Sequence, residues 1–282
     1  MSELSVVTIV RNRARHLARL VEGLAAGSAQ PRELIVVDMS DVPVELPALP
    51  FPARRIRLDA SGLALAAARN AGAQAAGGQR LLFLDVDCIP RRNLVATMDV
   101  ALTETDALIC PEVRYLGPEA AGLMDEAAFE RMSVHHPVRT FPKTGYREEF
   151  NAGLFWSLTF GIRRARYAAL GGFDDGYAGY GAEDTDFGFR AREAGLPLLF
   201  LGGTGSFHQY HGVISPPLQH LADIVRNAKR FRARWGMWPM TGWLEEFAAM
   251  GLVAFDEHDL RQIRDATPAD FAAATQPPSV YF

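Results

Sequence analysis

The sequence lacks the features that mark several protein classes. Only two of its 282 residues are cysteine, Cys88 and Cys110, which is too few for a disulfide framework and fits a reducing compartment. No stretch approaches the roughly 18 consecutive apolar residues that a membrane span needs, and the N-terminus lacks the basic start and apolar core of a signal peptide. Internal repeats and low-complexity tails are also missing. We therefore expect a cytoplasmic protein without a transmembrane segment.

The charge balance argues against a general nucleic-acid binder. The formal net charge is −4, with 22% charged and 49% apolar residues, as in ordinary soluble globular proteins. One basic run, residues 226–234, is of the kind that can lie against phosphates or acidic lipid, but it is more typical of a solvated helix face. We expect no nucleic-acid partner.

Strand-like and helix-like patterns alternate along the first part of the chain. Strands are predicted at residues 5–10, 33–38, 54–58, 81–84 and 107–112, and helices at residues 14–26, 63–76 and 93–103. This alternation predicts an α/β fold in which a mostly parallel sheet has helices on both faces. Ligands of such sheets bind at the carboxyl ends of the strands.

The second part of the chain is less regular. Residues 116–150 have no clean period and are interpreted either as a mobile lid or acceptor loop, or as disorder. Helices are predicted at residues 163–170 and from Glu183, and a short strand at residues 197–201. From Leu218 the pattern is helical, and its crowded aromatic residues suit a helix packing surface.

Two carboxylates follow the most apolar predicted strand. Residues 81–84 lead into Asp85, Val86 and Asp87, and the two acids would face the same way if the strand continued that far. Convergent carboxylates at the end of a strand suit Mg²⁺ or Mn²⁺, which prefer hard oxygen ligands. The alternative is that the pair caps the next helix, since Asp-X-Asp alone is a weak signal.

Three acidic residues stand after glycines at the start of a predicted helix. Glu183, Asp184 and Asp186 follow Gly179 and Gly181. Acidic residues are favourable at any helix N-terminus, so a structural role competes on even terms with a catalytic one. In the catalytic interpretation Asp184 or Glu183 removes a proton from an acceptor hydroxyl, and the glycines let a substrate approach the backbone.

Two histidines form a third cluster. His208 and His211 follow a glycine-rich segment, and a turn there would bring both imidazoles to one ion. Together with Asp85 and Asp87 they suit a mixed carboxylate and imidazole site for Mn²⁺.

These clusters, together with the basic segment after the first strand, resemble an inverting glycosyltransferase of the large family 2 type, and more narrowly its galactosyltransferase branch. The passages that carry the resemblance, in the family's order and separation, are residues 9–17, 85–87, 171–174 with 179–184, and 208–211. The resemblance implies a GT-A, Rossmann-like sheet over residues 1–214. A nucleotide-sugar half would span about 1–115 and an acceptor and catalytic half about 116–214, with a C-terminal helical extension, 215–282, packed on them.

The resemblance implies a donor site for a UDP-sugar. Its expected residues are Thr8, Val10, Arg11, Arg13, Asp38, Arg69, Asp85 and Val86. Arg69 keeps two interpretations, a phosphate contact or a contact with a buried acid. Asp87 and His211 would bind Mn²⁺ (or Mg²⁺), and His208 stands where related galactosyltransferases carry a different metal ligand.

The resemblance also implies a mechanism. Asp184 would be the catalytic base and Glu183 would orient donor or acceptor, while Tyr180 and Trp156 would bind the acceptor. Mn²⁺ and an arginine of the first segment would stabilise the charge on UDP, and a single displacement predicts inversion at the anomeric carbon. We therefore predict a hexosyltransferase (EC 2.4 type) that moves a hexose or N-acetylhexosamine from a UDP-sugar to an acceptor hydroxyl.

The identities of the sugar and the acceptor stay open. Galactose, glucose and their N-acetylamino forms all fit, and discrimination is expected near Trp156, Ser157 and Phe160. The acceptor is a glycan, a lipid-linked sugar, a peptide or a small metabolite. The oligomeric state is also open, a homo-oligomer included.

Two rival functions differ in class from a glycosyltransferase. A nucleotidyltransferase also uses an acidic metal site, but it usually needs a glycine-rich basic loop, and residues 11–15 are basic without glycines. An inactive nucleotide-sugar-binding module would not need Asp87, Asp184 and His211 together. The sequence therefore favours the transferase.

Overall fold

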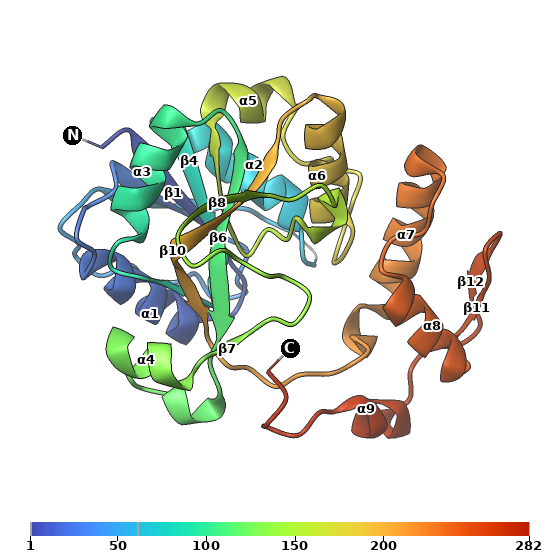
Figure 1. Cartoon of the computed structure of the whole chain (residues 1–282). Helices are drawn as coiled ribbons and strands as arrows, with labels where there is room; N and C mark the ends of the chain where they lie inside the picture. The colour runs from blue at the N-terminus through green and yellow to red at the C-terminus, as the bar shows by residue number, and fades with distance from the viewer. Residues whose placement is uncertain (1, 61, 282) are drawn as a thin grey trace.

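The computed structural model describes residues 2–60 and 62–281, and Figure 1 shows an α/β body with a smaller helical unit beside it. The strands of the body are β1 (Leu4–Val10), β2 (Glu33–Asp38), β3 (Ala53–Arg57), β4 (Arg80–Leu84), β5 (Cys88–Pro90), β6 (Leu108–Tyr115), β7 (Val134–His135), β8 (Gly145–Glu148), β9 (Thr159–Arg163) and β10 (Leu198–His208). Its helices are α1 (Ala14–Ala25), α2 (Leu65–Ala75), α3 (Leu94–Glu104), α4 (Glu126–Met132), α5 (Arg164–Ala169) and α6 (Glu183–Glu193), with short 3₁₀ turns η1 (Pro118–Ala120) and η2 (Ala152–Leu154).

The described strands of the body form one sheet in the order β3-β2-β1-β4-β9-β6-β10-β5, with β7 paired to β6 and β8 to β10. β3, β2, β1 and β4 pair in parallel, as do β6 and β10, while β9 runs antiparallel between β4 and β6. The carboxyl ends of β1, β2, β4, β6 and β10 therefore lie along one edge of the sheet. This confirms the predicted α/β class with a mostly parallel central sheet.

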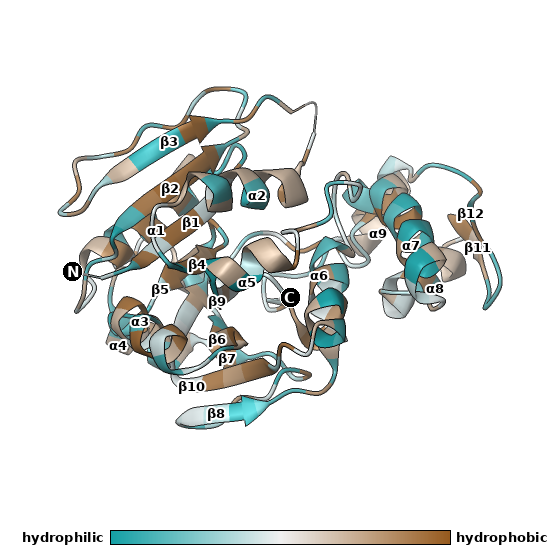
Figure 2. Cartoon of the chain, turned by 90° about the horizontal axis from the view of Figure 1, so that it is seen from above, coloured by the Kyte–Doolittle hydropathy of each residue, from teal (hydrophilic) through white to brown (hydrophobic). Residues whose placement is uncertain are grey.

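Helices cover both faces of this sheet, as Figure 2 shows. Successive side chains of a strand point to opposite faces, and in β1 this alternation feeds two cores. Val6 and Val10 pack in the core that contains α1 and α3, whereas Val7 and Ile9 pack in the core that contains α2, α5 and α6. The apolar runs of β1, β2 and β4 are explained by this two-sided burial.

Two segments differ from the sequence-based expectation. Residues 116–150 contain α4, β7 and β8, so the segment has more regular structure than a loop. The glycine-rich residues after Leu201 are part of β10, which continues to His208 after a register shift. Gly205 is required there because a Cβ would stand 1.9 Å from the carbonyl oxygen of Glu112 on β6.

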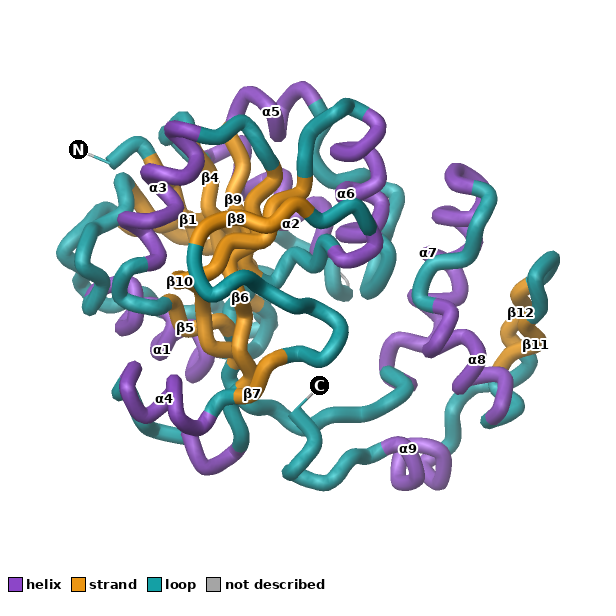
Figure 3. Tube along the Cα trace, viewed as in Figure 1, coloured by secondary structure: helices purple, strands orange, loops and turns teal. Residues whose placement is uncertain are grey.

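The C-terminal unit has its own hydrophobic core. It contains η3 (Leu218–His220), α7 (Leu221–Trp235), α8 (Thr241–Ala249) and α9 (Pro268–Ala274), and also a short hairpin of β11 (Val253–Phe255) and β12 (Leu260–Gln262) that the helical prediction missed. Figure 3 shows that the chain enters this unit through an irregular segment after β10. The expected domain boundary at 214/215 falls in that segment. No helix among the described residues is long and apolar enough to cross a membrane.

Gly72 sets how closely α2 packs on the sheet, which gives a first prediction. A Cβ at this position would stand 2.3 Å from Cγ1 of Val7 and 3.2 Å from Cγ2 of Val37. We expect Gly72→Ala to lower the free energy of unfolding by about 1–3 kcal/mol, because overpacking outweighs the higher helix propensity of alanine. Urea unfolding measures this. The matched control is Gly62→Ala, which meets no atom within 4 Å, and an equal loss in both variants would contradict the packing argument.

Candidate functional site

The candidate site lies at the edge where parallel strands end. β1 ends at Val10 and leads to Arg11 and Arg13, β4 ends at Leu84 and leads to Asp85 and Asp87, and β10 ends at His208. The N-terminus of α6, with Glu183 and Asp184, reaches the same place, since the charge of Asp184 acts on Asp85. The three predicted clusters therefore meet, as the carboxyl-end rule requires.

Asp87, His208 and His211 form a group that can hold a metal ion. One potential ligand atom from each residue lies within 4.8 Å of the others, the one such group of three among the residues that the structure describes. Nε2 of His208 is 3.5 Å from Oδ1 of Asp87, and Nε2 of His211 is 3.8 Å from Oδ2. Oδ1 of Asp87 is buried and accepts no hydrogen bond. A buried carboxylate oxygen without a partner beside two imidazoles fits a divalent transition metal.

The protonation states of this group suit ligation. Burial lowers the pKa of His208 to about 4, so its imidazole is neutral at neutral pH. Burial opposes ionisation of Asp87, but the nearby His208, Arg13 and His211 outweigh burial and hold the pKa of Asp87 below its ordinary value. Arg13 donates a hydrogen bond to Oδ2 of Asp87. This places its guanidinium beside the group of Asp87, His208 and His211, which we call the metal end of the site. Both ligand types are thus in the form that metals bind.

Arg69 joins two acids at the centre of the site. Its guanidinium is 3.1 Å from Asp85 and 3.2 Å from Glu183, and the residue is only 3% exposed. Of its two interpretations, the structure shows the contact with buried acids. The guanidinium also lies over the ring of Phe173, 5.2 Å from its centroid.

The carboxyl groups around Arg69 outnumber its single charge. Burial raises the pKa of Glu183 to about 7, with Asp184 adding to the shift and Arg69 opposing it. Burial also raises the pKa of Asp85 to about 6 and raises that of Asp184. Glu183 accepts hydrogen bonds from Arg69 and from the amide of Gly181, whereas Asp184 is only partly buried and accepts from the amide of Thr185. Asp184 is therefore the more accessible acid.

The condition under which Asp85 and Asp87 would face the same way is not met. The strand ends at Leu84, and residues 85–88 form a turn in which the amide of Cys88 donates to the carbonyl of Asp85. The two carboxylates consequently bind different partners, Asp85 the guanidinium of Arg69 and Asp87 that of Arg13. The tight turn ends the strand alternation on which a common direction depended.

Several predicted donor residues are buried. Thr8 and Val10 are each 1% exposed, and Val86 is 7% exposed, so the expected nucleotide contacts of these residues stay predictions. Asp38 is fully buried, and its two oxygens accept from the amides of Ser40 and Val44. Its expected contact with a base stays a prediction. Nη2 of Arg11 lies 3.9 Å from Asp41, and its Nη1 is buried without a hydrogen-bond partner.

The predicted acceptor residues lie in aromatic groups. Tyr180 stacks on His220, with ring centroids 4.4 Å apart and planes at 15°. Trp156 meets His136 edge-on, and the guanidinium of Arg139 lies 5.0 Å from its ring centroid. Phe160, expected near the donor, is instead fully buried and stacks on Phe83, so it is a core residue.

Sequence reasoning missed His220 and Asn227. Both lie in the C-terminal unit, to which no site residue was assigned, and no local motif distinguishes them from other polar residues of a helical segment. The side chain of Asn227 donates to the carbonyl oxygens of Ala178, Tyr180 and Gly181. Only the folded chain shows that these residues contact the loop of residues 178–181, which precedes α6.

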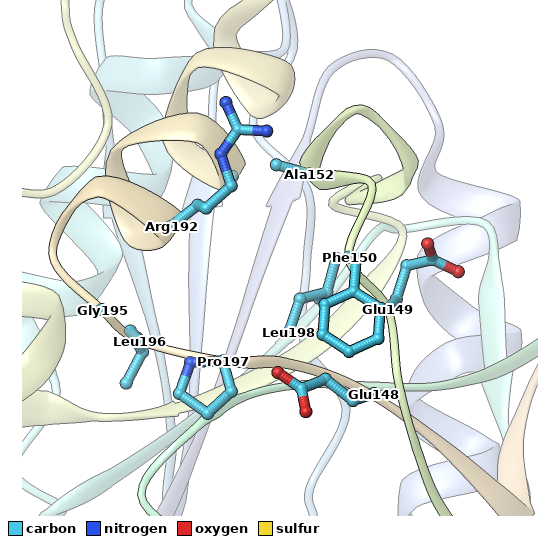
Figure 4. Close-up of a pocket in the computed structure, with 10 residues that line it drawn as sticks. Glu148, Glu149, Phe150, Ala152, Arg192, Gly195, Leu196, Pro197 and Leu198 are labelled. Carbon is cyan, nitrogen blue, oxygen red and sulfur yellow. The ribbon is translucent and has the colours of Figure 1, made fainter.

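A separate cavity of about 200 Å³ lies between the end of α6 and strands β8 and β10 (Figure 4). The residues that line it are Glu148, Glu149, Phe150, Ala152, Gly188, Arg192, Gly195, Leu196, Pro197 and Leu198. None of these belongs to the group of Asp87 or to that of Arg69. The cavity is therefore distinct from the candidate site.

Comparison with known families agrees with this geometry. Residues 5–122 match the model of glycosyl transferase family 2, and residues 135–212 match that of the N-terminal domain of galactosyltransferase. The two matches contain β1, the Asp-X-Asp turn, the α6 acids and both histidines. Residues 5–122 therefore carry a glycosyl transferase family 2 domain.

Curated relatives of this transferase include two bacterial enzymes named validoxylamine A glucosyltransferase. The protein of Streptomyces hygroscopicus subsp. limoneus is 26% identical over 225 residues, covering 69% of this chain and 49% of the relative. The protein of Streptomyces hygroscopicus subsp. jinggangensis (strain 5008) is also 26% identical over 225 residues, covering 69% of this chain and 52% of the relative. The transferase thus spans about half the length of these relatives.

Solved structures share the fold of the transferase. GalNAc-T7 with UDP, GalNAc and Mn²⁺ gives a TM-score of 0.57 at 18% identity, covering 88% of this chain and 57% of the other. TarS 1–349 of S. aureus gives a TM-score of 0.54 at 14% identity, covering 82% and 66%. At these identities the likeness shows the GT-A fold alone.

The raised pKa of Glu183 predicts how the transferase's stability depends on pH. A carboxyl whose pKa rises from 4.5 to about 7 on folding releases its proton more readily in the unfolded chain, so stability falls as the pH rises through this window. Glutamine has no carboxyl proton to release, so this pH-dependent loss of stability is absent in Glu183→Gln. We expect the variant to be more stable than the wild type at pH 8, by on the order of 2 kcal/mol, and equally stable near pH 4, as measured by urea unfolding. A difference independent of pH would contradict the assigned cause.

Proposed function

We propose that the chain is a metal-dependent inverting transferase that moves a hexose or N-acetylhexosamine from a UDP-sugar to an acceptor hydroxyl. The observation that carries this proposal is the meeting of two different groups at one sheet edge. Asp87, His208 and His211 offer a metal site, while Asp184 offers a base, and Asp85 lies within electrostatic range of both Asp87 and Asp184. A metal centre beside a carboxylate base is what displacement of a diphosphate by a hydroxyl requires.

The metal end would hold the leaving group. Asp87, His208 and His211 would bind Mn²⁺ (or Mg²⁺), and the bound ion would neutralise charge on the departing diphosphate. Arg13 donates to Asp87, so its guanidinium is near enough to add positive charge there, whereas Arg11, which follows the same strand, lies 3.9 Å from Asp41. The Mn²⁺ and UDP in the structure of GalNAc-T7 support this donor and this ion.

The carboxylates at the start of α6, Glu183 and Asp184, would bind the acceptor and remove the proton of its hydroxyl group. Burial raises the pKa of Asp184, which makes its carboxylate a stronger base than an exposed aspartate. Glu183 is tied to Arg69 and to the loop amide of Gly181, so it would orient groups and leave proton removal to Asp184. One base and no separate nucleophile correspond to a single displacement with inversion.

The relatives' names favour the sugar class without fixing the sugar. Glucose is transferred by the curated relatives according to their names, and GalNAc is bound in the structure of GalNAc-T7. Glucose and N-acetylgalactosamine are therefore the first donors to test. A cytoplasmic location and a homo-oligomer stay predictions from the sequence.

Asp184→Asn tests the assignment of the base. The amide keeps the size of the side chain but does not remove a proton, so we expect turnover to fall about 10²- to 10⁴-fold while UDP affinity stays within twofold. Turnover is measured as UDP release with an acceptor present, and ¹H NMR of the wild-type product should show the inverted anomer.

The matched control is Asp106→Asn, which alters a surface acid paired with Arg166 and should leave turnover unchanged. A product with retained configuration, or full activity of Asp184→Asn, would overturn the proposed mechanism.

A further inference from the structure

Tyr180 belongs to two environments at once. Its side chain packs against the core of the C-terminal unit, and its ring lies 6.1 Å from that of Trp243 on α8. On its other side, burial and the charges of Glu183 and Asp184 raise the pKa of its hydroxyl, with smaller contributions from Asp85 and Asp87. Tyr180 is therefore one place where the C-terminal unit approaches Glu183 and Asp184.

His220 extends this contact from the C-terminal unit. It is the last residue of η3 and stacks on Tyr180, with the ring centroids 4.4 Å apart and the ring planes nearly parallel. The residue is partly buried and lies within electrostatic range of Arg13, which is itself hydrogen-bonded to Asp87. The stacked pair therefore adjoins the loop that leads to Glu183 and Asp184.

The C-terminal unit also holds the loop of residues 178–182, which contains Tyr180. Asn227 on α7 is 1% exposed, and its amide group donates to three carbonyl oxygens of residues 178–181 at 3.0–3.1 Å. Gly179, Gly181 and Ala182 have positive φ angles of 80°, 97° and 67°, a backbone path that needs external support. The C-terminal unit therefore fixes where Tyr180 and Glu183 stand.

We propose that the C-terminal unit supplies one wall of the acceptor site, and that His220, stacked with Tyr180, binds a saturated polyol ring such as a sugar or a cyclitol. This inference rests on the proposed transferase function. The stacked rings are only partly buried, so an aromatic ring face offers a flat apolar surface to the C–H face of such a ring. The carboxylates beside them accept hydrogen bonds from its hydroxyl groups, and Asp184 removes the proton of the hydroxyl that attacks.

The chemistry of this wall favours a ring over an extended peptide. A polyol ring combines an apolar face with many hydroxyl donors, which matches an aromatic pair next to Asp85, Glu183 and Asp184. A peptide with one serine or threonine presents no ring face to the aromatic pair and only one hydroxyl donor to the partly exposed carboxyl groups of Asp85 and Asp184. His220 is accordingly assigned as a specificity-determining residue.

The test measures the KM of ring acceptors in three variants. UDP release is followed with UDP-glucose or UDP-N-acetylgalactosamine as donor, and with methyl β-glucoside, myo-inositol or a serine- and threonine-containing peptide as acceptor. We expect turnover with a ring polyol, and we expect His220→Ala to raise the KM for it about five- to tenfold. His220→Phe, which keeps the stacking surface, should restore most of the affinity.

Controls separate this inference from the proposed function. Gln219→Ala changes an exposed neighbour of His220 and should leave the KM unchanged. UDP affinity of His220→Ala, measured by calorimetry with Mn²⁺, should stay within twofold of the wild type. Failure of the wild type to bind UDP would count against the transferase itself.

Three results would overturn the acceptor wall while leaving the transferase intact. These are UDP binding without turnover of any ring polyol, turnover of the peptide alone, and an unchanged KM in His220→Ala.

Discussion

The site depends on one buried arrangement, the guanidinium of Arg69 held between Asp85 and Glu183. These residues come from α2, from the turn after β4 and from the start of α6, so a single cation joins three elements that are distant in the sequence. Removing Arg69 would leave both acids without a compensating charge, and breaking a buried ion pair in this way typically costs about 3–5 kcal/mol. The position of Asp87 and of Asp184, each close in sequence to one of the two acids, follows from this contact.

The two carboxylates of the Asp-X-Asp turn have different partners and different roles. Asp85 compensates a cation that belongs to the protein, whereas Asp87 has a buried oxygen without a hydrogen-bond partner and two imidazoles beside it. Because the chain turns between them, a structural charge and a ligand-binding charge lie close together without competing for one partner. Burial, and after it the neighbouring acids, raise the pKa values of Glu183 and Asp85. Raised carboxyl pKa values are common at sites where a carboxylate acts as a general base.

Much of the body was predictable because the apolar pattern of a strand or helix indicates which of its faces are buried. β1, β2, β4 and their helices were expected within about two residues of where they lie, and the carboxyl-end rule brought the three clusters together. The turn at residues 85–88 was not predictable, because the residues after the apolar run do not show whether the strand continues or a tight turn begins. β5, β7 and β8 are short antiparallel additions whose partners, β10 and β6, are remote in the chain. The contact of His220 with Tyr180 depends on how the C-terminal unit packs, which no local pattern encodes.

The most direct test of the central claim is calorimetric titration of UDP into the protein with and without Mn²⁺, repeated on Asp87→Ala. We predict UDP binding that requires Mn²⁺ in the wild type and is lost in the variant, because Asp87 supplies the carboxylate of the metal site. Binding that is equal with and without metal, or that survives the loss of Asp87, would contradict the metal site and the donor site built on it.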